Sequence, residues 1–237
     1  MKTTKKNTFF CLLILCCVFN SFSINAQETE MGKRWKEVNL AAQIPEAALS
    51  TMPTEELIKA YLNSRFTDYL FLYDDVATAF GCAYDDFNGL RELLKREDAA
   101  KKLIEFYQKM DPGAYDLDWE LVKKGKFIFS FIVVEVLLAQ ESIHNKLTKS
   151  EVKTLLAELL KKNELKTPHP KMYTMYNSQF SAYSIARLLE SKGKDNGISQ
   201  TLSQTPGIVH LLKTGRLQDK DALSVVIQKA KEFLNTY

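Results

Sequence analysis

Few side chains in this sequence could form a nucleophile and its base. Cys82 is the only cysteine outside the N-terminal segment, and the histidines are His144, His169 and His210. A cysteine beside a histidine would give the nucleophilic pair of an amidase or cysteine peptidase. Cys82 follows Phe80 at the end of an apolar stretch, where cysteine packs as a small hydrophobic residue. No histidine lies in a catalytic motif, so we interpret Cys82 as a core residue and keep the pair as an alternative.

Glu135 interrupts the most apolar part of the chain, Phe127 to Ala139. A carboxyl group buried there must be hydrogen-bonded, paired or protonated. It could be a protonated acid in a cleft, which would suit a hydrolase of cell-wall peptide or glycan. The simpler interpretation, which we favour, is a carboxylate paired with a Lys, Arg or Tyr of a neighbouring helix.

Two aspartate pairs, Asp74-Asp75 and Asp85-Asp86, could offer oxygen ligands to a cation. On one continuous helix they would lie roughly 16 Å apart, too far to share an ion. Zinc, nucleotide-binding and serine-hydrolase motifs are missing from the sequence. We therefore expect helix caps at the aspartates, no metal, no cofactor and no enzymatic activity.

Aromatic residues are concentrated on one expected helix, 171–191. Tyr173, Tyr176 and Phe180 fall on one side, and Tyr183 lies further round. Such a helix is either packed between others or keeps an apolar strip for a partner. Packing is the simpler interpretation, but these four residues are the best candidate binding strip.

The elements that must position these side chains are helices, because apolar residues recur at intervals of three and four along most of the chain. Thr148 and Glu151 have the spacing of a capping box. Residues 27–50 and 196–218 are less regular and are expected to form short helical turns and loops. The predicted helices cover residues 54–64, 66–81, 84–95, 97–110, 117–142, 149–163, 171–191 and 219–235.

Short connections between these helices favour antiparallel hairpins. The sequence therefore predicts an all-α fold: a single domain of packed antiparallel helical hairpins, arranged as an irregular bundle or a HEAT-like array. Phe127 to Ala139 is expected to be its central helix. The many β-branched residues there leave a short buried strand as an alternative.

Residues 1–26 have the layout of a secretory signal peptide, with three lysines, a short apolar run and Ala26 before the expected cleavage at Gln27. The apolar run is too short for a transmembrane anchor, and the residues before Cys16 and Cys17 do not suit lipidation. We expect export to the periplasm or outside the cell, and a single helical domain over 27–237.

The excess of positive charge lies in the expected signal peptide. The chain has 32 Lys and Arg against 29 Asp and Glu, and Lys2, Lys5 and Lys6 account for the excess. A neutral mature chain lacks the basic surface of a nucleic-acid binder. With Cys82 alone it cannot form an internal disulfide, so its stability must come from its core.

Two segments carry a resemblance: Met52-Pro53-Thr54-Glu55-Glu56-Leu57, and Phe87-Asn88-Gly89-Leu90 with the Leu-Leu-Lys-Arg-Glu-Asp-Ala run that follows. Over residues 50–110 the chain resembles a helical module of uncharacterised secreted proteins from Bacteroidetes-type bacteria. The resemblance implies a helical module sometimes joined to a peptidase- or amidase-like domain, and no catalytic residue carries over from it.

These observations favour a secreted, non-enzymatic helical protein that binds another secreted protein. One alternative is an inhibitor or immunity-type partner of a secreted cell-wall enzyme. Others are a cell-wall hydrolase using Cys82 or Glu135, and a small-ligand groove lined by tyrosines.

Overall fold

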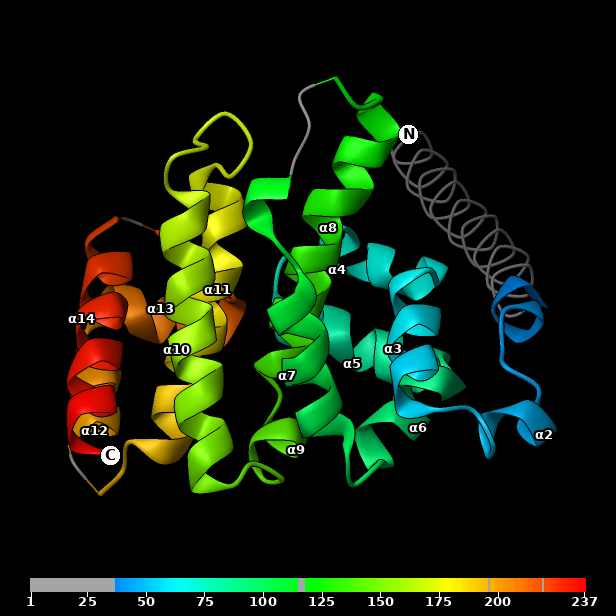
Figure 1. Cartoon of the computed structure of the whole chain (residues 1–237), viewed down its shortest axis with the longest axis horizontal. Helices are drawn as coiled ribbons and strands as arrows, with labels where there is room; N and C mark the ends of the chain where they lie inside the picture. Colours follow the sequence, from blue (N-terminus) through cyan, green and yellow to red (C-terminus); the bar gives the residue numbers. More distant parts are fainter. Residues whose placement is uncertain (1–36, 115–117, 196, 219) are drawn as a thin grey trace, which may run out of the picture. The chain divides into compact units, whose positions relative to one another are not determined.

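The computed structural model describes residues 37–114, 118–195, 197–218 and 220–237 (Figure 1). The chain divides after Gln43 into two units, and residues 37–41 of the first are helical. The second unit, Ile44–Tyr237, is compact and carries everything discussed below. The expected signal peptide, 1–26, and the predicted start of the domain at 27 lie outside the described residues.

The regular elements of the compact unit that the structure describes are all helical, which confirms the all-α prediction. They are α2 (Glu46–Leu49), α3 (Thr54–Leu62), η1 (Arg65–Asp68), α4 (Tyr69–Leu72), α5 (Val76–Asp86), α6 (Asn88–Lys95), α7 (Ala99–Lys109), η2 (Pro112–Ala114), α8 (Leu121–Leu138), α9 (Glu141–His144), α10 (Lys149–Lys166), α11 (Met175–Lys192), α12 (Ile198–Gln204), α13 (Pro206–Thr214) and α14 (Lys220–Thr236).

The predicted helix 66–81 is wrong as a single element, because the chain turns at residues 73–75. Tyr73 and Asp75 have extended backbone conformations, and the Asp75 carboxylate accepts a hydrogen bond from the Thr78 amide at 2.7 Å. Asp75 therefore caps a new helix, α5. The turn is held from far along the chain, since Arg216 donates to the carbonyl oxygens of Tyr73 and Asp74 at 3.3 Å each.

In the region 196–218, where short helical turns and loops are predicted, the described residues form two short helices, α12 and α13. Pro206 occupies the first turn of α13, where its missing amide proton costs nothing. Gly215 ends α13 with φ at 72°, and a side chain there would also overlap Val76. Glycine is thus required at 215 both by its backbone conformation and by the close approach to α5.

Helix α11 lies at the centre of the packing. It contacts α8, α10 and α14 along its length, together with the shorter α9, α12 and α13. Figure 1 shows α10 and α11 as an antiparallel pair beside α14 and α8. In a linear array each repeat contacts only its neighbours, so the contacts of α11 describe an irregular bundle.

Helix α8 is buried along only part of its length. Its described side chains are buried from Phe131 to Leu138, and none from Leu121 to Ser130 is buried. The prediction of a central helix over Phe127 to Ala139 is thus right from Phe131 onward, whereas Phe127 to Ser130 are only half-buried. No strand forms there, and among the residues that the structure describes no helix is long and apolar enough to cross a membrane.

Candidate functional site

Glu135 lies in the core between α7, α8, α10 and α11. One of its oxygens, Oε1, accepts hydrogen bonds from Lys166 Nζ at 2.5 Å, Tyr107 OH at 2.7 Å and Ser181 Oγ at 2.8 Å. Lys166 also donates to Ser181 at 2.9 Å, and Ser184 donates to the Glu135 carbonyl oxygen. The side chains of Glu135 and Lys166 are 0% and 2% exposed, so this buried ion pair is sealed from solvent.

For Glu135 the geometry contradicts the hypothesis of a protonated acid in a cleft and agrees with that of a carboxylate paired with a neighbouring helix. An acid in a cleft is wrong, because Glu135 faces a lysine and a tyrosine inside the bundle. The sequence reasoning missed Lys166, although a signal exists. Lys162 and Lys166 continue the apolar stripe of Leu155 and Leu159 at helical spacing, so they face the core.

Two further contacts make the position of Lys166 specific. Its ammonium lies 5.2 Å from the centre of the Phe131 ring and 5.7 Å from that of Tyr173. Burial, aided by the charge of Glu135, raises the pKa of Tyr107 well above its usual value, so Tyr107 stays a neutral donor. Among the described residues the cluster is sealed from solvent and leaves only Oε2 of Glu135 without a hydrogen-bond partner.

Of the candidate strip, Tyr176, Phe180 and Tyr183 lie on α11, whereas Tyr173 precedes this helix, which begins at Met175. Tyr173, Phe180 and Tyr183 are buried, and Tyr173 donates to the Pro112 carbonyl oxygen at 3.2 Å. The side chain of Tyr176 lies outside the described residues. For the other three, an exposed strip is wrong and packing between helices is what the structure has, because α8, α10 and α14 surround α11.

Cys82 is half-buried, and its thiol is hydrogen-bonded with the Tyr73 hydroxyl, which raises the pKa of Tyr73 to about 12. No histidine bonds to it in the part of the chain that the structure describes. His144 instead pairs with the Leu138 carbonyl oxygen at 2.8 Å, and burial lowers its pKa to about 4. The arrangement gives Cys82 no base.

The aspartate pairs act locally. Asp75 caps α5, and Asp86 accepts from the Tyr69 hydroxyl at 2.5 Å. Across the described ranges, no three His, Cys, Asp or Glu side chains are placed to hold a metal ion.

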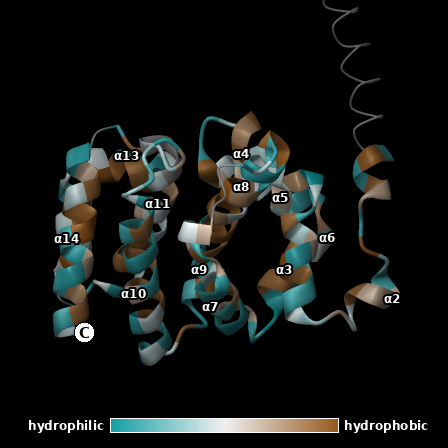
Figure 2. Ribbon diagram, turned by 45° about the horizontal axis from the view of Figure 1, so that its top comes forward, coloured by the Kyte–Doolittle hydropathy of each residue, from teal (hydrophilic) through white to brown (hydrophobic). Residues whose placement is uncertain are grey.

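An exposed apolar surface lies elsewhere, on α4 and the first half of α8. We call Phe71, Leu72, Leu121 and Val122 the α4–α8 surface; they are 53%, 65%, 83% and 81% exposed. The two helices meet where Phe71 stacks on Phe129, with ring centres 4.7 Å apart. Val122 shares a helix face with Phe129 two turns away. Figure 2 colours both helices as largely hydrophobic.

Basic side chains accompany this surface. Lys123, Lys124 and Lys126 lie in the first two turns of α8, next to its two exposed apolar residues. Lys123 packs its ammonium 4.1 Å from the centre of the Trp119 ring, and Lys126 donates to Asn63 at the end of α3 at 2.7 Å. The surface therefore combines apolar side chains with nearby positive charge.

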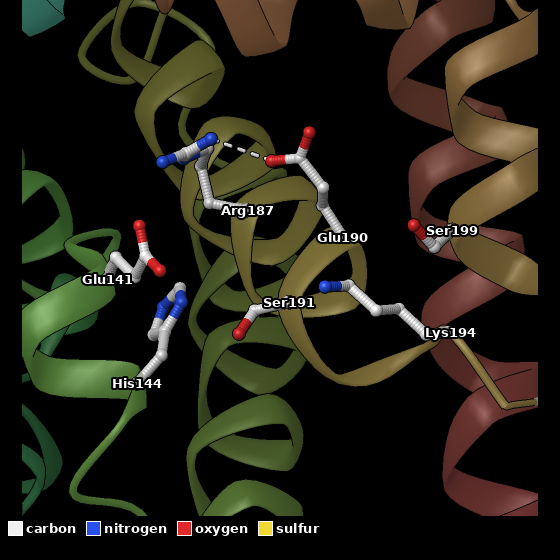
Figure 3. A pocket seen from close by; sticks show the side chains of 7 residues that line it. All are labelled: Glu141, His144, Arg187, Glu190, Ser191, Lys194 and Ser199. Atoms are coloured by element: carbon white, nitrogen blue, oxygen red, sulfur yellow. Dashed lines mark hydrogen bonds and ion pairs between the residues drawn. The ribbon is translucent and has the colours of Figure 1, made fainter.

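Two pockets flank Arg187 on α11. The polar pocket has a volume of about 390 Å³ and is shown in Figure 3. Its charges balance, with Glu141 and Glu190 against Arg187 and Lys194. His144, Ser191 and Ser199 complete its lining.

The aromatic pocket has a volume of about 410 Å³ and lies between α5, α6, α9 and α11. Phe80, Leu94 and Tyr183 line it and are themselves buried. Arg187 belongs to both pockets, since its side chain lines each of them.

Comparison with known proteins gives no match to a family model, a curated protein or a solved structure.

Proposed function

We propose that this chain is a secreted, non-enzymatic binding module that docks another protein on its α4–α8 surface. The observation that carries the proposal is the exposure of Leu121 and Val122, at 83% and 81%, at the start of a helix whose other half is buried. Large contiguous apolar patches are rare on the surfaces of monomeric proteins and mark interaction sites.

The chemistry of the surface indicates what its partner looks like. Apolar side chains of α4 and α8 would form the centre of an interface and exclude water. The lysines at 123, 124 and 126 would face its rim, where opposite charge steers association. The expected partner is therefore a protein that presents an apolar depression bordered by acidic residues. The expected export signal places that partner in the periplasm or outside the cell.

Photo-cross-linking in the producing cells tests the proposal. A photoreactive residue at position 122 should give a protein adduct of one defined mass, and the same residue at Lys153, exposed on α10, should not. The captured protein, once purified, should bind the chain directly. Val122→Asp should weaken that binding by about ten-fold or more, because a charge would be buried at the interface centre.

Val209→Asp is the matched control, since Val209 is a single exposed valine on α13 at 43% exposure. Both variants should fold, as judged by circular dichroism, and Val209→Asp should bind as the unaltered chain does. Equal weakening by both substitutions would contradict the proposal. So would adducts formed only with lipid or with a second copy of the chain.

A further inference from the structure

The aromatic pocket combines an apolar lining with an excess of positive charge. Phe80, Leu94 and Tyr183 are 8%, 8% and 4% exposed, so they form a preformed apolar wall whose position is fixed by the core behind it. A pocket of about 410 Å³ lies in the size range of small-molecule sites. Side chains already held in place lose little entropy on binding a ligand.

The charged side chains of this pocket are Arg91, Lys95 and Arg187 against Asp85. Arg91 is held at the end of α5, where it donates to the carbonyl oxygens of Tyr84 at 3.0 Å and Asp85 at 2.5 Å. Lys95 is exposed and, within the described residues, makes no hydrogen bond or ion pair. Glu190 pairs with Arg187, so the pocket keeps an excess of one positive charge, and Lys95 is its uncommitted cation.

Arg187 offers a directed donor. One terminal nitrogen, Nη1, donates to Glu190 at 2.7 Å. The other, Nη2, has no acceptor among the described residues and is not buried, whereas Nε is buried without an acceptor there. The ion pair with Glu190 fixes the guanidinium, so the free nitrogen is held ready for an anionic acceptor.

We propose that the aromatic pocket binds a small organic carboxylate with an apolar body. The carboxylate accepts a hydrogen bond from Arg187 Nη2, with Lys95 contributing long-range attraction. The apolar body lies against Phe80, Leu94 and Tyr183. This site is separate from the α4–α8 surface and does not depend on the proposed function.

Three probes test separately the contribution of the ligand's carboxylate and that of its apolar body. We expect 3-phenylpropionate to bind saturably, with a dissociation constant of about 1 mM or below, in a titration followed by two-dimensional NMR. Its neutral amide and acetate should each bind about ten-fold more weakly or worse, because one lacks the charge and the other the apolar body. Saturable binding of the amide as tight as that of the acid, or no saturable binding of the acid, overturns the proposal.

Variants locate the site. Arg187→Gln should reduce probe affinity about ten-fold, and it should fold, because it removes only a partly exposed ion pair. The matched control is Lys102→Gln, which removes an ion pair of the same i,i+3 spacing and similar exposure on α7. Lys95→Gln changes an exposed side chain without a hydrogen bond or ion pair among the described residues, so it should leave the fold intact. It should weaken probe binding about two-fold.

Equal affinities in the Arg187→Gln and Lys102→Gln proteins would overturn the proposal, since attraction to any surface cation would then explain binding. Val122→Asp should leave probe binding unchanged. Failure at the pocket is therefore distinguishable from failure at the α4–α8 surface.

Discussion

At the scale of single residues, Glu135 shows how a charge can be accommodated in an apolar helix. Three donors converge on one of its oxygens, and each comes from a different helix: Tyr107 on α7, Lys166 on α10 and Ser181 on α11. Burying either charge alone would be strongly unfavourable, whereas the pair with its hydrogen bonds is tolerated. The relative positions of α7, α8, α10 and α11 thus depend on the single carboxylate of Glu135.

Glu135→Gln should therefore lower the free energy of unfolding by about 3–5 kcal/mol, because it leaves the ammonium of Lys166 buried without a counter-charge. Urea unfolding followed by circular dichroism measures the loss. Replacing both partners, as in Glu135→Gln with Lys166→Met, should recover part of it, since the second change removes the orphaned charge.

The control for this prediction is Glu164→Gln. Glu164 also pairs with a lysine, Lys231 at 3.5 Å, but both side chains are more than half exposed. Exposed pairs contribute about 0–1 kcal/mol, so the control should be close to neutral. If Glu135→Gln were as mild as Glu164→Gln, the buried pair would not hold the core as argued.

At the scale of helices, the start of a helix was predictable where neighbouring side chains in the sequence define it. The capping box is present in full: Thr148 accepts from the Glu151 amide at 3.3 Å, and Glu151 accepts from the Thr148 amide at 2.9 Å. The break at residues 73–75 was not predictable from local spacing. It is fixed by Arg216, whose bonds to Tyr73 and Asp74 join positions far apart in the sequence.

Thr148→Ala should lower the free energy of unfolding by about 1 kcal/mol, because it leaves an amide of the first turn of α10 without its acceptor. Thermal unfolding of the two proteins measures the difference. Thr154→Ala is the matched control, since Thr154 is exposed in the interior of the same helix and alanine is favourable there. A cost as large for Thr154 as for Thr148 would mean that the cap contributes nothing specific.

The candidate binding surface was harder to predict than the helices that carry it. Aromatic content on α11 indicated a special helix, but periodicity does not say how many neighbours surround it, and Tyr173, Phe180 and Tyr183 are buried. The reverse holds for α8, where an unbroken apolar run hides a change from half-buried to buried side chains at Phe131. Lysines at 123, 124 and 126 mark the exposed half, and they are the sequence signal that could have found it.

At the scale of the whole molecule, His144 makes the free energy of unfolding depend on pH in the acid range. Burial, together with the nearby charges of Arg187 and Lys192, lowers its pKa from 6.5 to about 4. The unfolded chain therefore binds a proton at a higher pH than the folded chain does. This contribution to stability is complete above pH 6.5, declines as the pH falls from 6.5 to 4, and amounts to up to about 3 kcal/mol.

His144→Gln should flatten the dependence of unfolding free energy on pH between 6.5 and 4, because glutamine can donate to Leu138 but cannot take up a proton. Urea unfolding at a series of pH values measures this slope. His169→Gln, at an exposed position, should keep the slope of the unaltered protein. Identical slopes in all three proteins would show that His144 does not govern the acid response.

The contacts of Gly215 and Arg216 with residues 73–76 also bear on the order in which the molecule can assemble. A chain is made from its N-terminus, so the turn between α4 and α5 emerges long before the residues that hold it. Loop closure over that separation comes late and is entropically costly. The turn between α4 and α5 therefore gains these contacts only after Gly215 and Arg216 have been made.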